Sequence, residues 1–136
     1  MSLLDAKPPK PVTGFRKHVP LPLLVIFAII ISFLATYALW DYPEERAITT
    51  FLNTLEAGNY QQAYKLWQPS PSYSYNDFVH DWGLQGDYGK IRTFDILDSD
   101  SKGSETVLVT VRINHVNPPL GLLVDRKTKG LAYSFY

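Results

Sequence analysis

The chain contains 136 residues, with 13 basic and 13 acidic side chains and no cysteine. The lack of cysteine excludes a disulfide framework, a thiolate metal site and a cysteine nucleophile. The basic residues do not gather in the clusters that a nucleic-acid-binding surface requires, so we expect no nucleic acid among the partners. The 94 residues that follow Tyr42 (136 minus 42) are enough for one small domain with a modest core.

Residues 1–20 carry four prolines and four basic side chains, opposed by one aspartate. They show no apolar period, which predicts an extended tail. Pro8 and Pro11 have the PxxP spacing that binds aromatic grooves, but so short a pattern also fits a tail that only supplies positive charge. His18 is expected to add to this charge.

Residues 21–40 form an apolar run without one charged side chain, LPLLVIFAIIISFLATYALW. At about 1.5 Å of rise per residue, a helix of this length spans roughly the 30 Å of a bilayer's hydrocarbon core. Basic residues precede the run, and acidic residues follow it from Asp41 onward. This asymmetry predicts a single-pass protein of the cell (inner) membrane, with a cytoplasmic tail over 1–20 and an extracytoplasmic domain over 41–136.

Leu21 opens the run, Trp40 closes it and Tyr42 follows two residues later. The two aromatic side chains are of the kind that anchors a helix at the membrane surface. A cleaved signal peptide is the alternative, because it also combines a basic start with an apolar segment. Its apolar segment is shorter, however, at roughly 7 to 15 residues. The one acceptable cleavage site, Thr36–Ala38, carries a tyrosine and lies inside the run. We therefore expect a retained anchor, with the lipid bilayer as a partner.

A first short helix is expected directly after the anchor. Asp41 and Glu44 have the spacing of an N-terminal capping box, with Pro43 in the first turn. Gly58 is placed to end this helix in a left-handed conformation. The predicted apolar face has spacings of three and four and consists of Ile48, Phe51, Leu52 and Leu55.

Two further helices of the same kind are expected. Asn59 and Gln62 have the spacing of a helix start, and so do Ser74 and Asp77. The segment Pro-Ser-Pro at residues 69–71 separates the two helices. Their predicted apolar faces are Tyr60, Ala63, Tyr64 and Trp67, and then Tyr75, Phe78, Val79 and Trp82. Three faces with one spacing predict a helical layer that covers an apolar surface.

From Lys90 the apolar period changes from near 3.6 to 2, which predicts strands. Four strands are expected, over residues 90–98, 106–116, 120–125 and 131–136. Their connections, including a hairpin signal at 126–130, are too short for parallel crossovers, so the sheet should be an antiparallel meander. Helices first and strands afterwards place the chain in the α+β class: a transmembrane helix, then three short helices packed on an antiparallel sheet of about four strands.

The segment FLNTLEAGNYQQAYKLW (residues 51–67) resembles the opening of nuclear transport factor 2-like domains. In those domains a first helix ends in a short Ala-Gly-Asp/Asn turn, and a second helix begins Tyr-x-x-Ala-Tyr. The resemblance covers residues 43–136 and implies a third short helix followed by a curved antiparallel sheet.

This superfold hosts isomerases, dehydratases, transport adaptors and periplasmic scaffolds, so the resemblance alone does not select a function. Single-pass members with a short cytoplasmic tail, such as the inner-membrane scaffold of type IV secretion, usually assemble or brace larger complexes. The resemblance therefore implies a non-catalytic accessory, scaffold or assembly subunit, with other membrane protein subunits as partners. The alternatives are a membrane-anchored module that binds a small apolar ligand and an orphan isomerase-like enzyme.

Four residues are candidates for a pocket or an interface: Trp67, Trp82, Tyr88 and His115. Trp67 and Trp82 lie on apolar helix faces and are expected to pack on the sheet. His115 continues the alternation of the strand over 106–116 and is expected to form hydrogen bonds at the rim of the packed face.

A catalytic or metal site has weaker support. His80 lies near Asp77 and Asp81 at spacings that fit a metal or acid–base site, and that equally describe a solvated helix face. Asp87, Tyr88 and Asp95 could serve a pocket, as Tyr and Asp do in ketosteroid isomerases. The sequence has no phosphate-binding glycine loop, no Ser–His–Asp arrangement and no metal-spaced histidine pair. We therefore expect no catalytic residue, metal or cofactor.

Overall fold

The computed structural model describes residues 9–10, 14 and 20–135. The chain divides into two compact units, residues 1–35 and 36–136, and each is described by itself. Pro8, Pro11 and His18 lie outside the described residues, so the expectations for them stay predictions.

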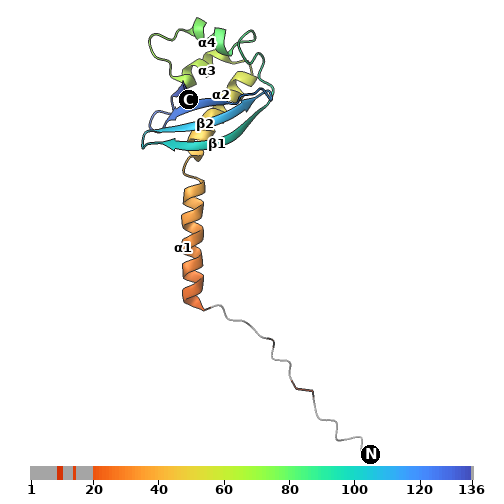
Figure 1. Ribbon diagram of the computed structural model, residues 1–136, viewed down its shortest axis with the longest axis vertical. Coiled ribbons are helices and arrows are strands. Elements are labelled where there is room, and N and C mark those ends of the chain that lie inside the picture. Colours follow the sequence, from red (N-terminus) through yellow and green to blue (C-terminus); the bar gives the residue numbers. More distant parts are fainter. Residues whose placement is uncertain (1–8, 11–13, 15–19, 136) are drawn as a thin grey trace, which may run out of the picture. The chain divides into compact units, whose positions relative to one another are not determined.

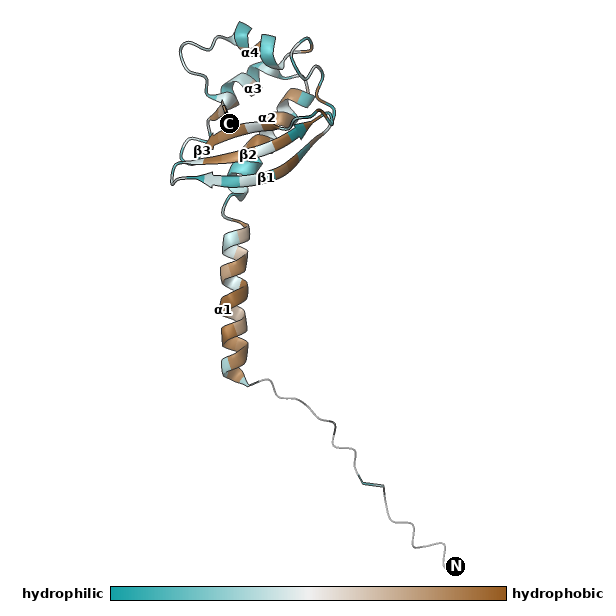
Figure 2. Ribbon diagram, viewed as in Figure 1, coloured by the Kyte–Doolittle hydropathy of each residue, from teal (hydrophilic) through white to brown (hydrophobic). Residues whose placement is uncertain are grey.

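The first described element is a long apolar helix, α1 (Leu21–Ala38), drawn mostly in brown in Figure 2. It carries no charged side chain, and none of its residues is buried within the chain. Among the described residues, one helical stretch is long and apolar enough to cross a membrane, and α1 supplies its apolar part. The predicted apolar helix is thus confirmed; it ends at Ala38, and residues 39–41 form a turn.

Three shorter helices follow, α2 (Tyr42–Glu56), α3 (Tyr60–Trp67) and α4 (Tyr75–Trp82), as Figure 1 shows. Gly58, after α2, has a φ of 76°, so the predicted left-handed turn is confirmed. The side chain of Asn59 accepts a hydrogen bond from the backbone N–H of Gln62. Ser74 and Asp77 form a complete capping box at the start of α4. These caps satisfy backbone N–H groups that have no partner within the helix.

The predicted capping box at the start of α2 is wrong. Asp41 precedes the helix, but its side chain makes no capping hydrogen bond. Its carboxylate instead accepts a hydrogen bond of 2.6 Å from Nη2 of Arg126. A bond between two charged groups is stronger than a bond from a neutral N–H, so the tertiary contact displaces the local one.

One open antiparallel sheet contains β1 (Phe94–Lys102), β2 (Thr106–Ile113), β3 (Leu120–Asp125) and β4 (Leu131–Tyr133), in that order. The predicted meander and α+β class are confirmed. The first strand begins at Phe94 rather than Lys90, and β4 ends three residues early. β2 ends at Ile113 because Asn114 and His115 adopt left-handed φ values of 49° and 60°, which a strand cannot contain.

The core lies between the helices and one face of the sheet. The residues of β2 that face the helices, Val107, Val109, Val111 and Ile113, alternate with half-buried residues. α2 contributes its predicted face to the same core. α4 departs from prediction: it buries Phe78 and Trp82 but leaves Val79 exposed, since this short helix packs on α3 and turns only part of its face inward.

The first edge of the sheet is irregular. β1 carries a bulge between Ile96 and Asp98 where it pairs with β2. Asp95, Asp98 and Asp100 are all exposed, and they lie opposite the residues of β2 that face away from the helices. The edge strand therefore presents its acidic side chains on the open face of the sheet.

Candidate functional site

Trp67 and Trp82 form the centre of an aromatic cluster between the helices and the sheet. Their ring centroids lie 5.7 Å apart, and the ring of Phe51 lies 5.4 Å from Trp67 and 5.1 Å from Trp82. The two tryptophans are only 5% and 2% exposed. The space between the helices and the sheet is therefore occupied by the domain's own rings.

Two tyrosines stack on Trp82. Tyr88, from the loop after α4, has its ring centroid 5.8 Å from that of Trp82, with 26° between the planes. Tyr133, from β4, stacks at 5.9 Å with 5° between the planes. Three of the four predicted pocket or interface residues, Trp67, Trp82 and Tyr88, are thus brought together. Burial raises the pKa of Tyr88 above its usual range.

The carboxylate of Asp81 lies close to the hydroxyl groups of two tyrosines, Tyr73 and Tyr133. Oη of Tyr73 donates a 2.6 Å hydrogen bond to Oδ2 of Asp81, and Oη of Tyr133 lies 3.5 Å from the same oxygen. Burial is the largest cause that raises the pKa of both phenols well above their usual range. Both tyrosines therefore stay protonated at neutral pH and serve as hydrogen-bond donors.

The neighbouring His80 does not join this pair as part of an enclosed site. Its Nδ1 lies 3.5 Å from Oδ1 of Asp81, but the imidazole is exposed. Asp77 is engaged in the capping box with Ser74, which lowers the pKa of its carboxyl. Within the described residues, no group of three or more His, Asp or Glu side chains is placed to hold a metal ion.

An open hollow of about 480 Å³ lies beside this cluster. Trp67 and Tyr73 line it from the helical side, and Leu131 and Tyr133 line it from β4. Phe135, which follows β4, lies exposed at the same hollow. These aromatic side chains share the lining with the polar residues Gln68, Ser70 and Ser72. Sequence reasoning did not single out Tyr73, Tyr133 or Phe135.

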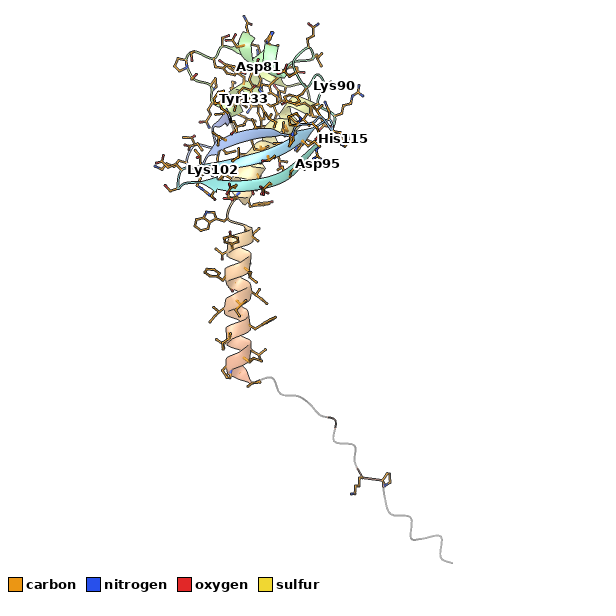
Figure 3. All side chains as sticks on the ribbon, in the orientation of Figure 1. Asp81, Lys90, Asp95, Lys102, His115 and Tyr133 are labelled. Atoms are coloured by element: carbon orange, nitrogen blue, oxygen red, sulfur yellow. The ribbon has the colours of Figure 1, made fainter. Side chains whose placement is uncertain are left out.

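His115 is separate from the aromatic cluster. It lies exposed in the turn after β2, so the prediction that it continues the alternation of that strand is wrong. It lines a different hollow, of about 430 Å³, together with Lys90 and Arg92. Figure 3 shows the labelled Lys90 and His115 at one end of the sheet, apart from Asp81.

A group of four charged side chains and one serine, which we name the Arg126 cluster, consists of Asp41, Glu44, Ser101, Arg126 and Lys129; Glu44 is its buried member. Nη2 of Arg126 donates to Asp41 at 2.6 Å and to Oγ of Ser101 at 2.7 Å. Nζ of Lys129 donates to Oε1 of Glu44, whose side chain is 3% exposed. The cluster joins the start of α2 to the end of β1 and to the hairpin between β3 and β4.

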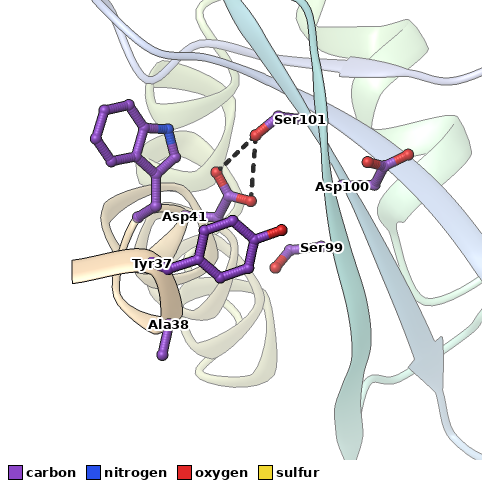
Figure 4. A pocket seen from close by; sticks show the side chains of 7 residues that line it. Tyr37, Ala38, Asp41, Ser99, Asp100 and Ser101 are labelled. Atoms are coloured by element: carbon purple, nitrogen blue, oxygen red, sulfur yellow. Dashed lines mark hydrogen bonds between the residues drawn. The ribbon is translucent and has the colours of Figure 1, made fainter. Parts of the chain in front are cut away.

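The predicted anchor residues Trp40 and Tyr42 are exposed, at 61% and 54%, as is Leu21 in the first unit. The guanidinium of Arg126 lies 5.9 Å from the ring centroid of Trp40. A hollow of about 310 Å³ has Trp40 and Asp41 in its lining. Oγ of Ser101 donates to the carboxylate of Asp41, at 3.1 and 3.4 Å from its two oxygens, and Figure 4 marks these hydrogen bonds. The Asp41 carboxylate is thus already occupied by partners within the chain.

The geometry therefore offers an aromatic cluster in which two tyrosines share Asp81, a separate hollow at His115, and the Arg126 cluster around Glu44 at the start of α2. Comparison with protein-family models, with characterised proteins and with solved structures finds no match to this chain in any of the three.

Proposed function

We propose that this protein is a single-pass membrane protein whose extracytoplasmic domain is a non-catalytic accessory, scaffold or assembly subunit of a larger membrane complex. α1 supports the membrane anchor, because its 18 residues carry no charge and none of them is buried within the chain. An apolar helix of this length is stable in lipid, where its backbone groups are satisfied internally. The orientation rests on the basic residues of the tail.

The observation that carries the subunit role is the filled interior of the domain. Phe51, Trp67 and Trp82 occupy the space between the helices and the sheet, with ring centroids 5.1 to 5.7 Å apart. A ligand enclosed there would displace at least one ring, and removal of a buried aromatic side chain typically costs about 3–5 kcal/mol. This packing favours action through the exterior of the domain, by contact with other proteins.

Purification from native membranes in a mild detergent tests the proposal. The tagged full chain should bring down other membrane proteins in a fixed ratio. Deletion of α1 should abolish this, because the anchor supplies the effective concentration that a weak interface needs. A matched control replaces α1 by an unrelated apolar helix of equal length: retained partners indicate contact through the domain, and lost partners indicate contact through α1.

Two results would contradict the proposal. One is a chain that elutes without stoichiometric partners from its native membrane. The other is a complex that assembles normally but loses its activity in His80→Ala or His115→Ala, since both side chains are exposed and removal of either should act within about 0.5 kcal/mol on stability. That second result would favour the enzyme.

One observation favours a second candidate, a membrane-anchored module for a small apolar ligand. The hollow beside Trp67 measures about 480 Å³, within the roughly 300–1,000 Å³ of small-molecule sites, and aromatic rings line it. If this role is correct, an apolar aromatic probe such as indole should raise the melting temperature of the full chain in nanodiscs. Phe135→Ala should reduce that shift, whereas an unchanged shift would contradict the assignment.

A further inference from the structure

Three side chains with basic groups line one hollow at the end of the sheet where β1 begins and β2 ends. They are Lys90 and Arg92, from the loop before β1, and His115, from the turn after β2. Thr93 and Asn114 complete the lining of this hollow, which measures about 430 Å³. Phe94 pairs with Ile113, so the register of the two strands brings the loop and the turn together.

The side chain of Asn114 holds the loop in place. Its Oδ1 accepts hydrogen bonds from the backbone N–H groups of Arg92 and Thr93, at 2.9 and 3.3 Å. Its Nδ2 donates to the backbone carbonyls of Tyr88 and Lys90, at 3.0 and 2.9 Å. An amide side chain has two donor hydrogens and two acceptor lone pairs, so all of them are used. Asn114 therefore fixes the backbone from which Lys90 and Arg92 project and has no bond left for a ligand.

The positive charges of Lys90 and Arg92 have no acidic side chain beside them in the lining of this hollow. No carboxylate lines it, and none of the ion pairs among the described residues includes Lys90, Arg92 or His115. The nearest acids in sequence are Asp87 in the preceding loop and Asp95, which lies opposite Arg112 on the open face of the sheet. Arg126 and Lys129, by contrast, are both engaged with carboxylates. Lys90 and Arg92 are exposed and line the same hollow, so their like charges repel each other, and a bound anion relieves that repulsion.

The available groups select the type of anion. The Lys90 ammonium, the Arg92 guanidinium and the Thr93 hydroxyl all donate hydrogen bonds, and the His115 imidazole can do so as well. A phosphate group offers three or more oxygens to such donors, whereas a carboxylate offers two. We propose that Lys90, Arg92, Thr93 and His115 form a binding site for a phosphate group, either free or carried by an ester. The site is independent of the subunit role proposed above.

Calorimetric titration of the purified full chain in phosphatidylcholine nanodiscs tests this site. Inorganic phosphate should bind saturably at an ionic strength kept constant with chloride. Lys90→Gln and Arg92→Gln should each weaken the affinity about tenfold, the factor expected for loss of one charge-assisted hydrogen bond. Lys127→Gln is the matched control, because Lys127 is an exposed lysine of the hairpin after β3 and should leave binding unchanged. Unchanged melting temperatures show that the variants fold.

A second titration separates the two sources of phosphate. Short-chain phosphatidic acid is compared with short-chain phosphatidylcholine under the same conditions. Binding of inorganic phosphate supports a soluble ligand, and binding of phosphatidic acid alone supports a lipid headgroup. Binding of neither phosphate nor phosphatidic acid, or an equal loss in Lys127→Gln, overturns the site. Because only the purified chain is used, this result does not depend on whether partner subunits exist.

Discussion

The indole of Trp82 and the phenol ring of Tyr133 lie almost parallel, with 5° between their planes and 5.9 Å between their centroids. This contact joins α4 to β4, an edge strand of three residues that pairs only with β3. So short a strand gains little from its own ladder, whereas a stacked aromatic pair contributes about 0.5–1.5 kcal/mol beyond the burial of its area. Trp82 therefore helps to hold β4 on the sheet.

Trp82→Ala should lower the free energy of unfolding by about 3–5 kcal/mol, because it removes a buried ring that contacts Phe51, Trp67 and Tyr133. Chemical denaturation of the full chain in detergent micelles measures this loss. Trp40→Ala serves as control, since Trp40 is exposed and contacts only the Arg126 guanidinium among the ring contacts of the described residues. It should cost no more than about 1 kcal/mol. Equal losses in the two variants would contradict the assignment of the core.

The raised pKa values of Tyr73, Tyr88 and Tyr133 predict an alkaline limit to stability. Folding favours the neutral phenols, so their contribution is complete below the unfolded pKa of about 10 and is lost as the pH rises above it. Ultraviolet absorbance should show a first group of tyrosines that ionise reversibly and a second group that ionises only with unfolding. Tyr133→Phe should reduce the second group alone. Reversible ionisation of all nine tyrosines in the folded state would refute this prediction.

Lys129→Met should destabilise the domain by about 1–3 kcal/mol, because it leaves the buried carboxylate of Glu44 without its closest donor. Lys127→Met, in the same hairpin, removes an exposed charge and should change stability by less than about 0.5 kcal/mol. The double variant Glu44→Gln/Lys129→Met should cost less than the sum of the single changes, since the two residues are in contact. Strict additivity in denaturation midpoints would show that they are not coupled.

Orientation in the membrane is tested with single cysteines, because the chain has none of its own. Ser104→Cys lies in the exposed turn between β1 and β2, and Ser2→Cys lies in the tail, outside the described residues. An impermeant thiol reagent added to intact cells should label the first variant and not the second. The reverse pattern would place the domain in the cytoplasm.

Local features of this fold were predictable from sequence because their partners are close along the chain. Ser74 and Asp77 are three residues apart, and their capping box forms as predicted. Asp41 and Glu44 have the same spacing, yet their partners are Arg126 and Lys129, 85 residues away. A local sequence pattern carries no information about partners so far apart in the chain, so sequence analysis does not predict the Arg126 cluster.

The residues of the candidate site likewise divide into those that a local pattern identifies and those that it does not. Trp67 and Trp82 were found because helical spacing identifies an inward face. Tyr73 and Tyr133, which share Asp81, are half-buried and come from a loop and an edge strand, where no periodic pattern identifies an inward-facing side chain. His115 was misplaced for a related reason: alternation predicts a strand, but two left-handed residues end β2 just before the pattern does.

Edge-to-edge joining of two copies of this sheet through β1 is disfavoured. Such pairing would bring Asp95, Asp98 and Asp100 of one copy beside the same carboxylates of the other, and like charges on adjacent strands repel. The bulge at Leu97 also interrupts the regular row of backbone groups that a new strand would need. At the opposite edge, β4 offers only three residues. Copies crowded together should therefore resist aggregation through continuous β-sheet, and any assembly they form must depend on side-chain contacts.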